Sequence, residues 1–440
     1  MKHGNRKRIL LLNPPGSLLY LRDYWCSTVS KAGYYWPPID LLIMSGILGQ
    51  EHEVIVIDAI VQGLNPDVCK SEIKAIAPDV IIFLSSVLSY DEDMSFIGSI
   101  DGMEDILTIG CGEVFIDGAE KVLAENPFIN GAVIDFTSKK ILALIDDPDC
   151  AEKVIVPEED TDSKYFEYPL PQFKKFPLGR YRYPCDRSKP FTSILTNYGC
   201  PYSCVFCNSG SSGFKLRKHD EILRELKDIT GMGIKQVFIA DMTFAADREH
   251  AVKFCKDVVK EGIKIDWHCY SRADIIDEEL LVLMKEAGCY LIQFGIESAD
   301  CNIMKKYKKN IPTEKILQTF MLLKKYRMMS GAHFIFGLPG EKKNASEESL
   351  ELAMEIDPDY VSFNIFYPRK KTGLAGIRTG CGSVEVEKAV KTAYKRFYCR
   401  PSYIIRKILK VRTFYELKNL ILTGYGLGKN ILSYKKGLPV

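Results

Sequence analysis

The sequence predicts an α/β protein with two sheet-based domains in tandem, and three observations support this prediction. Short apolar runs rich in β-branched residues alternate with helical patterns over residues 1–150. The alternation stops over residues 151–190 and resumes with six further strand–helix pairs over residues 191–370. A basic segment with a helical pattern, residues 371–440, follows. Such alternation is typical of parallel sheets covered by helices.

The first domain contains five candidate strands, RILLLN, HEVIVIDA, PDVIIFLSS, DILTIG and GAVIDF. Runs this apolar are typical of strands that are buried on both faces of a parallel sheet. Helical patterns such as PIDLLIMSGILGQ and DGAEKVLAENP separate the runs. We therefore expect a flavodoxin-like, doubly wound domain, in which ligands bind beyond the carboxyl ends of the strands.

The segment 151–190 differs from both neighbours, because prolines and aromatic residues replace any regular periodicity. Clusters of proline interrupt both helices and strands. We expect an irregular connector that packs on a neighbouring domain.

The second domain contains six candidate strands, FTSILTN, QVFIAD, IKIDWHCYS, CYLIQFGI, GAHFIFGL and YVSFNIFYP. Amphipathic helical patterns such as DEILRELKDIT and TEKILQTFMLLKKYR alternate with them. Six βα units predict a partial (β/α)6 barrel of TIM type, with its functional site at the carboxyl ends of the strands.

The last fifty residues form a basic, helical C-terminal tail. They contain twelve Lys or Arg, from Lys391 to Lys436, and one acid, Glu416, with apolar residues interleaved. One interpretation is a solvated helical cap that packs on the barrel. The other is attraction to an anionic membrane surface or to a lipid-like substrate.

The composition indicates a folded protein of a reducing compartment. Hydrophobic residues make up 46% of the chain and charged residues 26%, and the formal net charge of +2 disfavours nucleic-acid binding by the whole chain. Most of the fourteen cysteines are scattered singly, which does not suggest a disulfide framework. No apolar run reaches the length of about 18 residues that spans a bilayer, and the one near the N-terminus is too short for a signal peptide. We expect a cytoplasmic protein.

The run NYGCPYSCVFCNSG is the most informative motif, because it places three cysteines on one predicted loop. Cys200, Cys204 and Cys207 follow the spacing C-x3-C-x2-C. Ser211 and Ser212 stand where a fourth cysteine would complete a ferredoxin-like set. Three thiolates leave one metal position open, which is typical of a catalytic centre rather than a structural one.

The cysteine loop has two alternative explanations. A structural zinc site requires a fourth cysteine or histidine, and the local candidates Cys185 and His219 belong to no paired half-site. Chance clustering of core cysteines is the other alternative, but the loop also carries the turn residues Gly199, Pro201 and Gly210. An iron–sulfur cluster explains the loop better than either.

The cysteine motif, the order of the βα units and the string FGLPGE at residues 336–341 resemble the radical SAM superfamily. The resemblance implies a 4Fe–4S cluster on the three cysteines, whose open iron is chelated by S-adenosylmethionine. It implies that an electron from the cluster cleaves this molecule to a 5′-deoxyadenosyl radical, and that Phe206 lies near the adenine. An electron donor such as flavodoxin or ferredoxin is then required.

Residues at three further strand ends are candidate contacts for S-adenosylmethionine. Asp241 would bind an amine or a ribose hydroxyl, although aspartate at such a position also caps helices. Ser271 and Arg272 follow one strand, and an arginine there would form a charge-assisted bond to the ligand carboxylate. Gln293 and Glu297 are placed for ribose hydroxyls. Without the resemblance, ordinary loop salt bridges would explain the charged residues.

The order of Rossmann-like domain, connector, cysteine-bearing barrel and basic tail resembles the cobalamin-binding members of the superfamily. The resemblance implies cobalamin at the carboxyl edge of the first sheet, where the candidate residues are Asn13, Pro14, Ser85, Ser86, Gly110 and Gly112. Two features depart from the family. No histidine occurs between Glu53 and Lys218, so a D-x-H-x-x-G run is absent, and the sequence DFTS at 135–138 replaces the usual glycine–glutamate turn.

The resemblance implies an enzyme that transfers a methyl group to an unactivated carbon, since methylcobalamin is a donor that reacts with a substrate radical. Two alternatives stay open. One is a cobalamin-free or non-methylating radical SAM enzyme that catalyses ring formation, rearrangement or C–C coupling. The other is a non-catalytic iron–sulfur redox protein. The basic, apolar tail favours a lipid-like or secondary-metabolite substrate over nucleic acid.

Overall fold

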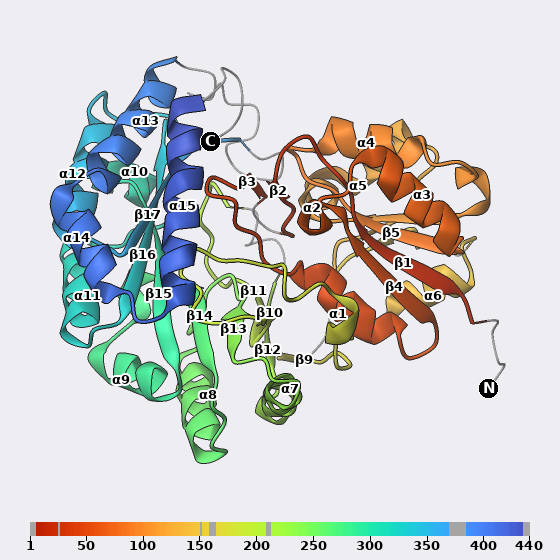
Figure 1. The fold of residues 1–440 in the computed structure, drawn as a ribbon, viewed down its shortest axis with the longest axis horizontal. Coiled ribbons are helices and arrows are strands. Elements are labelled where there is room, and N and C mark those ends of the chain that lie inside the picture. The colour runs from red at the N-terminus through yellow and green to blue at the C-terminus, as the bar shows by residue number, and fades with distance from the viewer. Residues whose placement is uncertain are drawn as a thin grey trace. The chain divides into compact units, whose positions relative to one another are not determined.

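The computed structural model describes most of the chain, namely residues 6–24, 27–149, 152–157, 164–207, 213–368 and 384–433. Ser211 and Ser212, residues 158–163 of the predicted connector, and residues 371–383 and 434–440 of the basic region lie outside the described residues. The chain divides into two compact units. The first comprises residues 1–30 and 34–183, and the second comprises residues 31–33 and 184–440. Figure 1 shows the labelled elements of both.

The first unit is built on a parallel sheet of six strands in the order β4–β1–β5–β6–β7–β8. The strands are β1 (Arg8–Asn13), β4 (Glu53–Asp58), β5 (Val80–Leu84), β6 (Leu107–Cys111), β7 (Gly131–Val133) and β8 (Val154–Ile155). All five predicted strands form, and their order is that of a flavodoxin-like sheet, which confirms the predicted fold. The sixth strand, β8, lies within the predicted connector. Two residues are too short a run to give a periodic signal.

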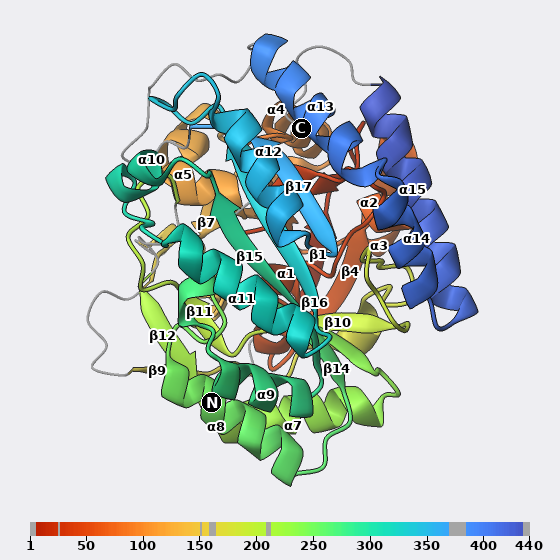
Figure 2. The same cartoon turned by 90° about the vertical axis from the view of Figure 1, so that its left-hand side faces the viewer.

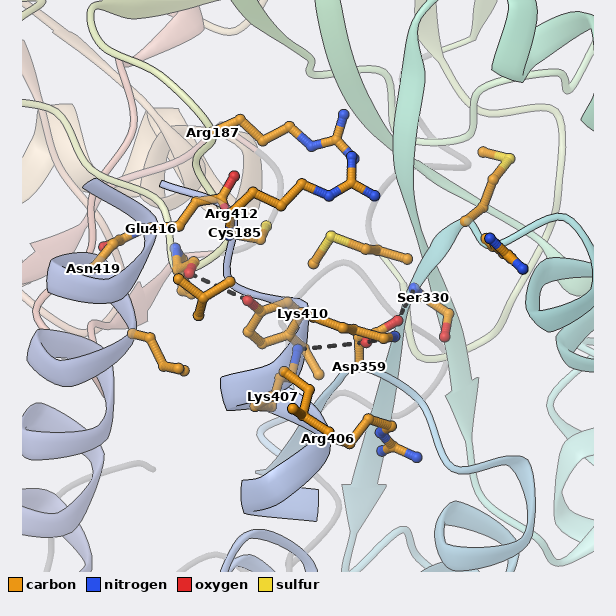
Figure 3. Close-up of a pocket in the computed structure, with 18 of the residues that line it drawn as sticks. Cys185, Arg187, Ser330, Asp359, Arg406, Lys407, Lys410, Arg412, Glu416 and Asn419 are labelled. Carbon is orange, nitrogen blue, oxygen red and sulfur yellow. Dashed lines mark hydrogen bonds and ion pairs between the residues drawn. The ribbon is translucent and has the colours of Figure 1, made fainter. Parts of the chain in front are cut away.

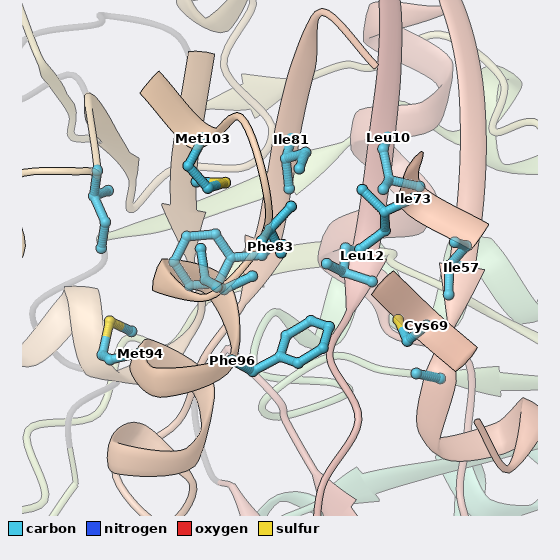
Figure 4. Packing of buried hydrophobic residues seen from close by; sticks show 14 of the residues in the cluster. Leu10, Leu12, Ile57, Cys69, Ile73, Ile81, Phe83, Met94, Phe96 and Met103 are labelled. Atoms are coloured by element: carbon cyan, nitrogen blue, oxygen red, sulfur yellow. The ribbon is translucent and has the colours of Figure 1, made fainter. Parts of the chain in front are cut away.

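Helices cover both faces of the first sheet, as expected for a doubly wound domain. They are α1 (Ile39–Leu48), α2 (Ala59–Gln62), α3 (Pro66–Ile76), α4 (Tyr90–Gly98), α5 (Glu113–Glu125) and α6 (Lys140–Asp146). A short hairpin, β2 (Tyr20–Leu21) with β3 (Thr28–Val29), follows β1. Figure 4 shows Leu12, Phe83 and Phe96 packed together in the core. Each such fully buried side chain contributes roughly 1.5–3 kcal/mol to folding.

Residues 164–183 of the predicted connector belong to the first unit, and residues 184–190 belong to the second. Every residue of α1 is buried, and a Cβ on Gly46 would collide with the carbonyl oxygen of Pro169. The amide of Gln172 donates to the Ser45 hydroxyl at 2.9 Å. This segment therefore covers α1 on the side where glycine permits a close approach.

The second unit is an open barrel of six parallel strands in the order β10–β13–β14–β15–β16–β17. They are β10 (Phe191–Ile194), β13 (Gln236–Ile239), β14 (Asp266–Ser271), β15 (Cys289–Glu297), β16 (Met329–Phe336) and β17 (Tyr360–Ile365). Each strand pairs with the next in the sequence. The partial (β/α)6 barrel is therefore confirmed.

The helices between these strands are α7 (His219–Gly231), α8 (Arg248–Lys260), α9 (Glu278–Glu286), α10 (Cys301–Lys306), α11 (Thr313–Lys325) and α12 (Ala345–Ile356). Figure 2 shows α11 and α12 covering the outer face of the strands. A small antiparallel pair, β11 (Asn197–Gly199) and β12 (Phe214–Arg217), flanks the cysteine loop.

The predicted basic tail is helical, with α13 (Val384–Tyr398), α14 (Pro401–Lys410) and α15 (Phe414–Ser433). The first of these helices closes the outer edge of β17. The amide of Val361 donates to the hydroxyl of Tyr398 at 2.9 Å, and that of Phe363 donates to Tyr394 at 3.1 Å. Tyrosine hydroxyls thus satisfy an edge strand that would otherwise expose its backbone donors. None of the described helices is long and apolar enough to cross a membrane.

Candidate functional site

The cysteine loop leaves the barrel at the carboxyl end of β10, through the short strand β11. Gly199 ends β11 with a φ of 76°, in the left-handed region that favours glycine. The amide of Cys200 donates to the carbonyl of Gly213 at 3.2 Å, and that of Val205 donates to the carbonyl of Tyr307 at 3.0 Å. The loop is therefore tied both to β12 and to the segment that follows α10.

The three thiols share this loop without closing into a cage. Among the described residues, no three His, Cys, Asp or Glu side chains lie close enough to share a metal ion. Cys200 is buried, and its sulfur lies 3.5 Å from the hydroxyl of Thr243. Cys204 and Cys207 are partly buried. The three candidate ligands are nonetheless all cysteine thiols. Sulfur ligands fit an iron–sulfur cluster better than a metal that prefers oxygen ligands.

Arg272 brings a positive charge next to the thiols. Its Nη1 atom lies 4.0 Å from the sulfur of Cys204, and its guanidinium stacks 4.0 Å from the centroid of the Tyr202 ring. Asp274 holds the other side of the guanidinium at 2.8 Å. Arg272 follows β14, as the sequence indicated, and its guanidinium lies near a thiol of the cysteine loop.

Lys309 is a second cation beside the loop, and no pattern in the sequence indicates its position. It is buried, forms an ion pair with Glu297, and lies 5.8 Å from the centroid of the Phe206 ring. Burial raises the pKa of the Cys204 thiol, while Lys309 and Arg272 oppose that rise. Two cations close to the Cys204 thiol fit a site that carries anionic sulfur.

Phe206 of the cysteine loop packs against a small apolar cluster. Its ring is 6.3 Å from that of Tyr307, in an edge-to-face arrangement, and Leu338 belongs to the same cluster. The turn after β16 is closed by Glu341, which accepts hydrogen bonds from the amides of Gly337 and Leu338 at 3.1 and 3.0 Å. The FGLPGE string therefore supplies one apolar wall beside Phe206.

Asp241 lies behind the loop, and its carboxylate is occupied by the chain itself. It accepts hydrogen bonds from the amides of Thr196 and Asn197 at 2.7 and 3.1 Å, from the Thr196 hydroxyl, and from the Asn197 side chain at 2.9 Å. It is fully buried, and burial raises its pKa to about 7. The carboxylate thereby fixes the start of β11 and does not cap the following helix.

The remaining candidates of the barrel are held by neighbouring strands. The hydroxyl of Ser271 donates to the carbonyl of Phe244 at 2.8 Å. The Gln293 side-chain oxygen lies 3.3 Å from Nε2 of His333, whose pKa is lowered to about 4 by burial. Phe206, Arg272 and Glu297 therefore gather at the cysteine loop around Lys309, whereas Ser271 and Gln293 lie in other contacts.

In the first unit, Asn13, Pro14 and Ser85 belong to a buried polar network around Arg22. Arg22 donates to the Asn13 side-chain oxygen and to the Pro14 carbonyl, both at 2.9 Å, and pairs with Asp93 at 2.5 Å. The Ser85 hydroxyl donates to the same aspartate at 2.8 Å. Nothing in the local sequence pattern marked Arg22 or Asp93, because they lie on different elements.

The other three candidates also contact their own domain. The Ser86 hydroxyl lies 2.8 Å from that of Ser89. A Cβ on Gly110 would collide with the Phe115 ring, and one on Gly112, whose φ is 102°, would lie 2.5 Å from the carbonyl oxygen of Ser85. These positions shape the carboxyl edge of the sheet, where the fold binds ligands. A ligand at this edge of the sheet would therefore meet mainly backbone, because the side chains of these candidates are small or already hydrogen-bonded within the domain.

Comparison with known proteins agrees with this geometry. The model of the radical SAM superfamily matches residues 194–353, from the end of β10 into α12. An uncharacterised methyltransferase of Pyrococcus horikoshii is 24% identical over 450 aligned residues, which cover 92% of this chain and 96% of that protein. The anaerobic magnesium-protoporphyrin IX monomethyl ester cyclase of Rubrivivax gelatinosus is 22% identical, covering 80% of this chain and 68% of that protein.

Among solved structures, the radical S-adenosylmethionine methyltransferase TsrM from Kitasatospora setae, with cobalamin and a 4Fe–4S cluster bound, has a similar fold. The TM-score is 0.61 at 17% identity, and the match covers 82% of this chain and 72% of that one. With the cysteine loop at the carboxyl end of β10, these findings identify residues 194–353 as a radical SAM domain, and the fold of the chain is similar to that of TsrM.

Proposed function

We propose that this enzyme holds a 4Fe–4S cluster, binds S-adenosylmethionine and cobalamin, and transfers a methyl group to an unactivated carbon. The observation that carries the proposal is the C-x3-C-x2-C loop at the carboxyl end of the first barrel strand, next to two buried cations. The similarity to a methyltransferase over nearly the whole chain supports methyl transfer.

Cys200, Cys204 and Cys207 would hold the cluster. The cluster supplies the electron that cleaves S-adenosylmethionine, and cobalamin supplies a transferable methyl group. Arg272 and Lys309 would balance the negative charge of the thiolates, because burial makes an unbalanced anion costly. Arg272 would also reach the ligand carboxylate, Glu297 a ribose hydroxyl, and Phe206 the adenine.

Asp241 would act as a positioning residue, because it holds Thr196 and Asn197 at the root of the cysteine loop. Ser271 and Gln293 would line the neighbouring strand ends. Asn13, Pro14, Ser85, Ser86, Gly110 and Gly112 would shape the edge on which cobalamin rests. No histidine occurs in the region from Glu53 to Lys218, so we propose that no histidine from that region ligates the cobalt.

A second candidate function is radical-mediated ring formation without methyl transfer. It is favoured by the similarity to a cyclase over 80% of this chain. The two functions differ in their products, since methyl transfer adds the mass of a methyl group and produces S-adenosylhomocysteine. Ring formation by the same radical does neither.

We propose a small-molecule or lipid-like substrate and an electron donor such as flavodoxin or ferredoxin. The tail supports contact with an anionic membrane, because its helices expose apolar residues beside many cations. Leu409 and Phe414 are 79% and 83% exposed, and Ile404, Ile405, Ile408 and Ile421 are also exposed. Basic helices with an exposed apolar face bind at the surface of anionic bilayers. Such an enzyme would work in the cytoplasm, at the membrane periphery.

The decisive experiment is anaerobic reconstitution with iron, sulfide and cobalamin. We expect about four irons per chain, a corrin absorption spectrum, and release of 5′-deoxyadenosine after reduction with S-adenosylmethionine present. Cys204→Ala should lose the cluster and this release. Cys399→Ala, which changes an exposed cysteine outside the loop, is the matched control.

Two outcomes would contradict the proposal. A cluster that gives no spectroscopic response to S-adenosylmethionine would favour a non-catalytic redox protein. Release of 5′-deoxyadenosine without any bound corrin would keep radical chemistry and remove cobalamin-dependent methyl transfer.

A further inference from the structure

A cavity of about 670 Å³ lies in the second unit, at the amino ends of β16 and β17. The cysteine loop is at the carboxyl end of the same parallel sheet, so the cavity is at the opposite end of the barrel. Its walls come from the segment before β10, the end of α11, the starts of the two strands, α14 and the start of α15 (Figure 3).

Positive charge predominates on the cavity wall. The cationic lining residues are Arg187, Lys324, Arg327, Arg406, Lys407, Lys410 and Arg412, and the acidic ones are Asp186, Asp357, Asp359 and Glu416. Two of the acids are shared between cations. Asp359 pairs with Lys410 at 2.7 Å and Lys407 at 3.6 Å, and Asp357 pairs with Arg406 and with Arg400 outside the cavity.

Three cations on the wall have no carboxylate within ion-pair distance in the part of the chain that the structure describes. They are Lys324, Arg327 and Arg412. The Nε atom of Arg406 is buried and, among the described residues, has no hydrogen-bond partner. The cavity wall therefore carries cationic donors that no acceptor in the described part of the chain satisfies.

Lys407 shows how the neighbouring cations of the cavity wall affect one another. Its side chain is only 6% exposed, and its ammonium lies 3.6 Å from the centroid of the Tyr360 ring. Burial lowers its pKa to about 8, and Lys410 and Arg406 add to the fall while Asp359 opposes it. Burial and Arg406 likewise lower the pKa of Lys324. An anion in the cavity would relieve the repulsion among these cations.

We propose that this cavity binds a phosphate group, either free or as a phosphate ester. Phosphate carries nearly two negative charges near neutral pH and offers several strong acceptor oxygens. Arginine forks and lysine ammonium groups are the usual donors to such an anion. Figure 3 shows the side chains of Arg187 and Arg412 extending in the same direction. Arg187 also pairs with Asp266 at 3.4 Å, so Arg412 is the guanidinium of the two without a carboxylate partner among the described residues.

Apolar residues complete the cavity and would accept the rest of an ester. Met328, Met329, Leu409 and Leu420 also line it. Leu409 belongs as well to the exposed apolar face of α14. A phosphate ester could therefore reach the cavity as a soluble molecule or as the headgroup of an anionic lipid.

The test is calorimetric titration of inorganic phosphate into the full-length, reconstituted enzyme. We expect saturable binding at one site. A variant carrying Lys324→Gln, Arg327→Gln and Arg412→Gln should bind phosphate at least about tenfold more weakly, because each exchange removes a charge-assisted donor. Lys256→Gln, on an exposed surface of α8, should leave binding unchanged. Release of 5′-deoxyadenosine should be the same in all three proteins.

Absence of saturable phosphate binding to the wild-type enzyme would overturn the proposal, and so would equal binding by wild type and triple variant. Arg412→Gln alone, which changes an exposed residue without an acidic partner among the described residues, tests the site if the triple variant does not fold.

Two further measurements identify the source of the phosphate. Titration of glycerol 3-phosphate represents a soluble ester, and flotation with vesicles of phosphatidic acid in phosphatidylcholine represents a lipid. Loss of flotation in the triple variant assigns the cavity to a lipid headgroup. Unchanged flotation together with weakened glycerol 3-phosphate binding assigns it to a soluble ester. Because cluster assembly is read separately, failure here does not affect the proposed chemistry.

Discussion

Asp241 is buried behind the cysteine loop, and among the described residues the hydrogen-bond donors to its carboxylate all come from Thr196 and Asn197. A carboxylate at the end of a barrel strand suggested a ligand contact in the sequence. The structure shows a side chain whose acceptors are already taken by the root of the loop. Thr243 connects this network to the thiols. Its carbonyl accepts a hydrogen bond from the Asn197 side chain, and its hydroxyl lies beside the sulfur of Cys200.

Asp241→Asn should loosen the cysteine loop. The amide keeps one acceptor oxygen but points an NH2 group at the Asn197 side chain, which is itself a donor. Leaving a buried donor unsatisfied costs about 1–3 kcal/mol. We expect a lower melting temperature and fewer irons per chain after reconstitution, with unchanged affinity for S-adenosylmethionine in the fraction that holds a cluster. Full iron content with weakened affinity would instead indicate a direct ligand contact.

Asp40, at the start of α1, makes the stability of the first unit depend on pH. One carboxylate oxygen accepts from the Leu41 amide at 3.0 Å, and the other is buried without a partner among the described residues. Burial, with a smaller contribution from Asp23, raises its pKa to about 8. An unfolded aspartate titrates near 3.9, so the folded chain holds a proton that the unfolded chain releases between these values.

The free energy of unfolding should therefore fall as pH rises from about 4 to 8, by up to about 1.4 kcal/mol per pH unit. Asp40→Asn mimics the protonated form, so it should flatten this decline and raise the melting temperature at pH 8 relative to wild type. Thermal unfolding at pH 5.5, 7 and 8.5 measures the effect. An unchanged slope in the variant would show that Asp40 is ionised in the folded protein.

The position of Lys309 next to the cysteine loop could not be predicted from the sequence. It stands in the run KKYKKN, where four lysines look alike. Only the fold turns Lys309 inward, between residues with positive φ at Lys308 and Asn310, to meet Glu297. The cysteines could be predicted because their spacing is itself the signal. A cation that depends on a loop conformation leaves no such pattern.

At the scale of elements, the long strands of both sheets could be predicted and the short ones could not. β15 and β16 are nine and eight residues long and mostly apolar, so they could be recognised as strands in the sequence. β8, with two residues, and β11, with three, are too short to produce a period. They form because a neighbouring strand edge offers hydrogen bonds, which is information from the tertiary structure.

The helices α14 and α15 yield a prediction at this scale. Ile405 and Ile408 lie one turn apart on the exposed face of α14 and do not line the basic cavity. Replacing both with Glu removes apolar area and adds negative charge, so binding to vesicles that contain phosphatidylglycerol should be lost. Flotation of wild-type enzyme and variant measures this. Val259→Glu, at an exposed position of α8, should float like the wild type.

Flotation of wild type on pure phosphatidylcholine to the same extent would show that charge plays no part. No flotation of the wild-type enzyme on anionic vesicles would leave the tail as a helical cap on the barrel, the alternative interpretation of its sequence.

At the scale of the whole molecule, the order of residues along the chain and their grouping in space differ at one point. Residues 31–33 belong to the second unit although the first unit surrounds them in sequence. The ammonium of Lys31 donates to the carbonyl of Phe363 at 3.0 Å, to the Asn364 side chain at 2.7 Å and to the Tyr394 hydroxyl at 3.2 Å. Composition marks the shift from one domain pattern to the next, but no local pattern reports a contact across 330 residues.

Lys31→Met should therefore destabilise the barrel. The exchange leaves buried acceptors at the end of β17 without their donor, and a hydrogen bond from a charged group contributes about 1.5–3 kcal/mol. Lys31→Arg, which keeps the charge and the donors, is the control. The fragment 184–440 lacks Lys31 altogether, so it should show the same weakness although it carries all six βα units. Hydrogen exchange of the β17 amides measures this region separately from the first unit. Equal protection in wild type and Lys31→Met would show that the barrel is complete without the N-terminal segment.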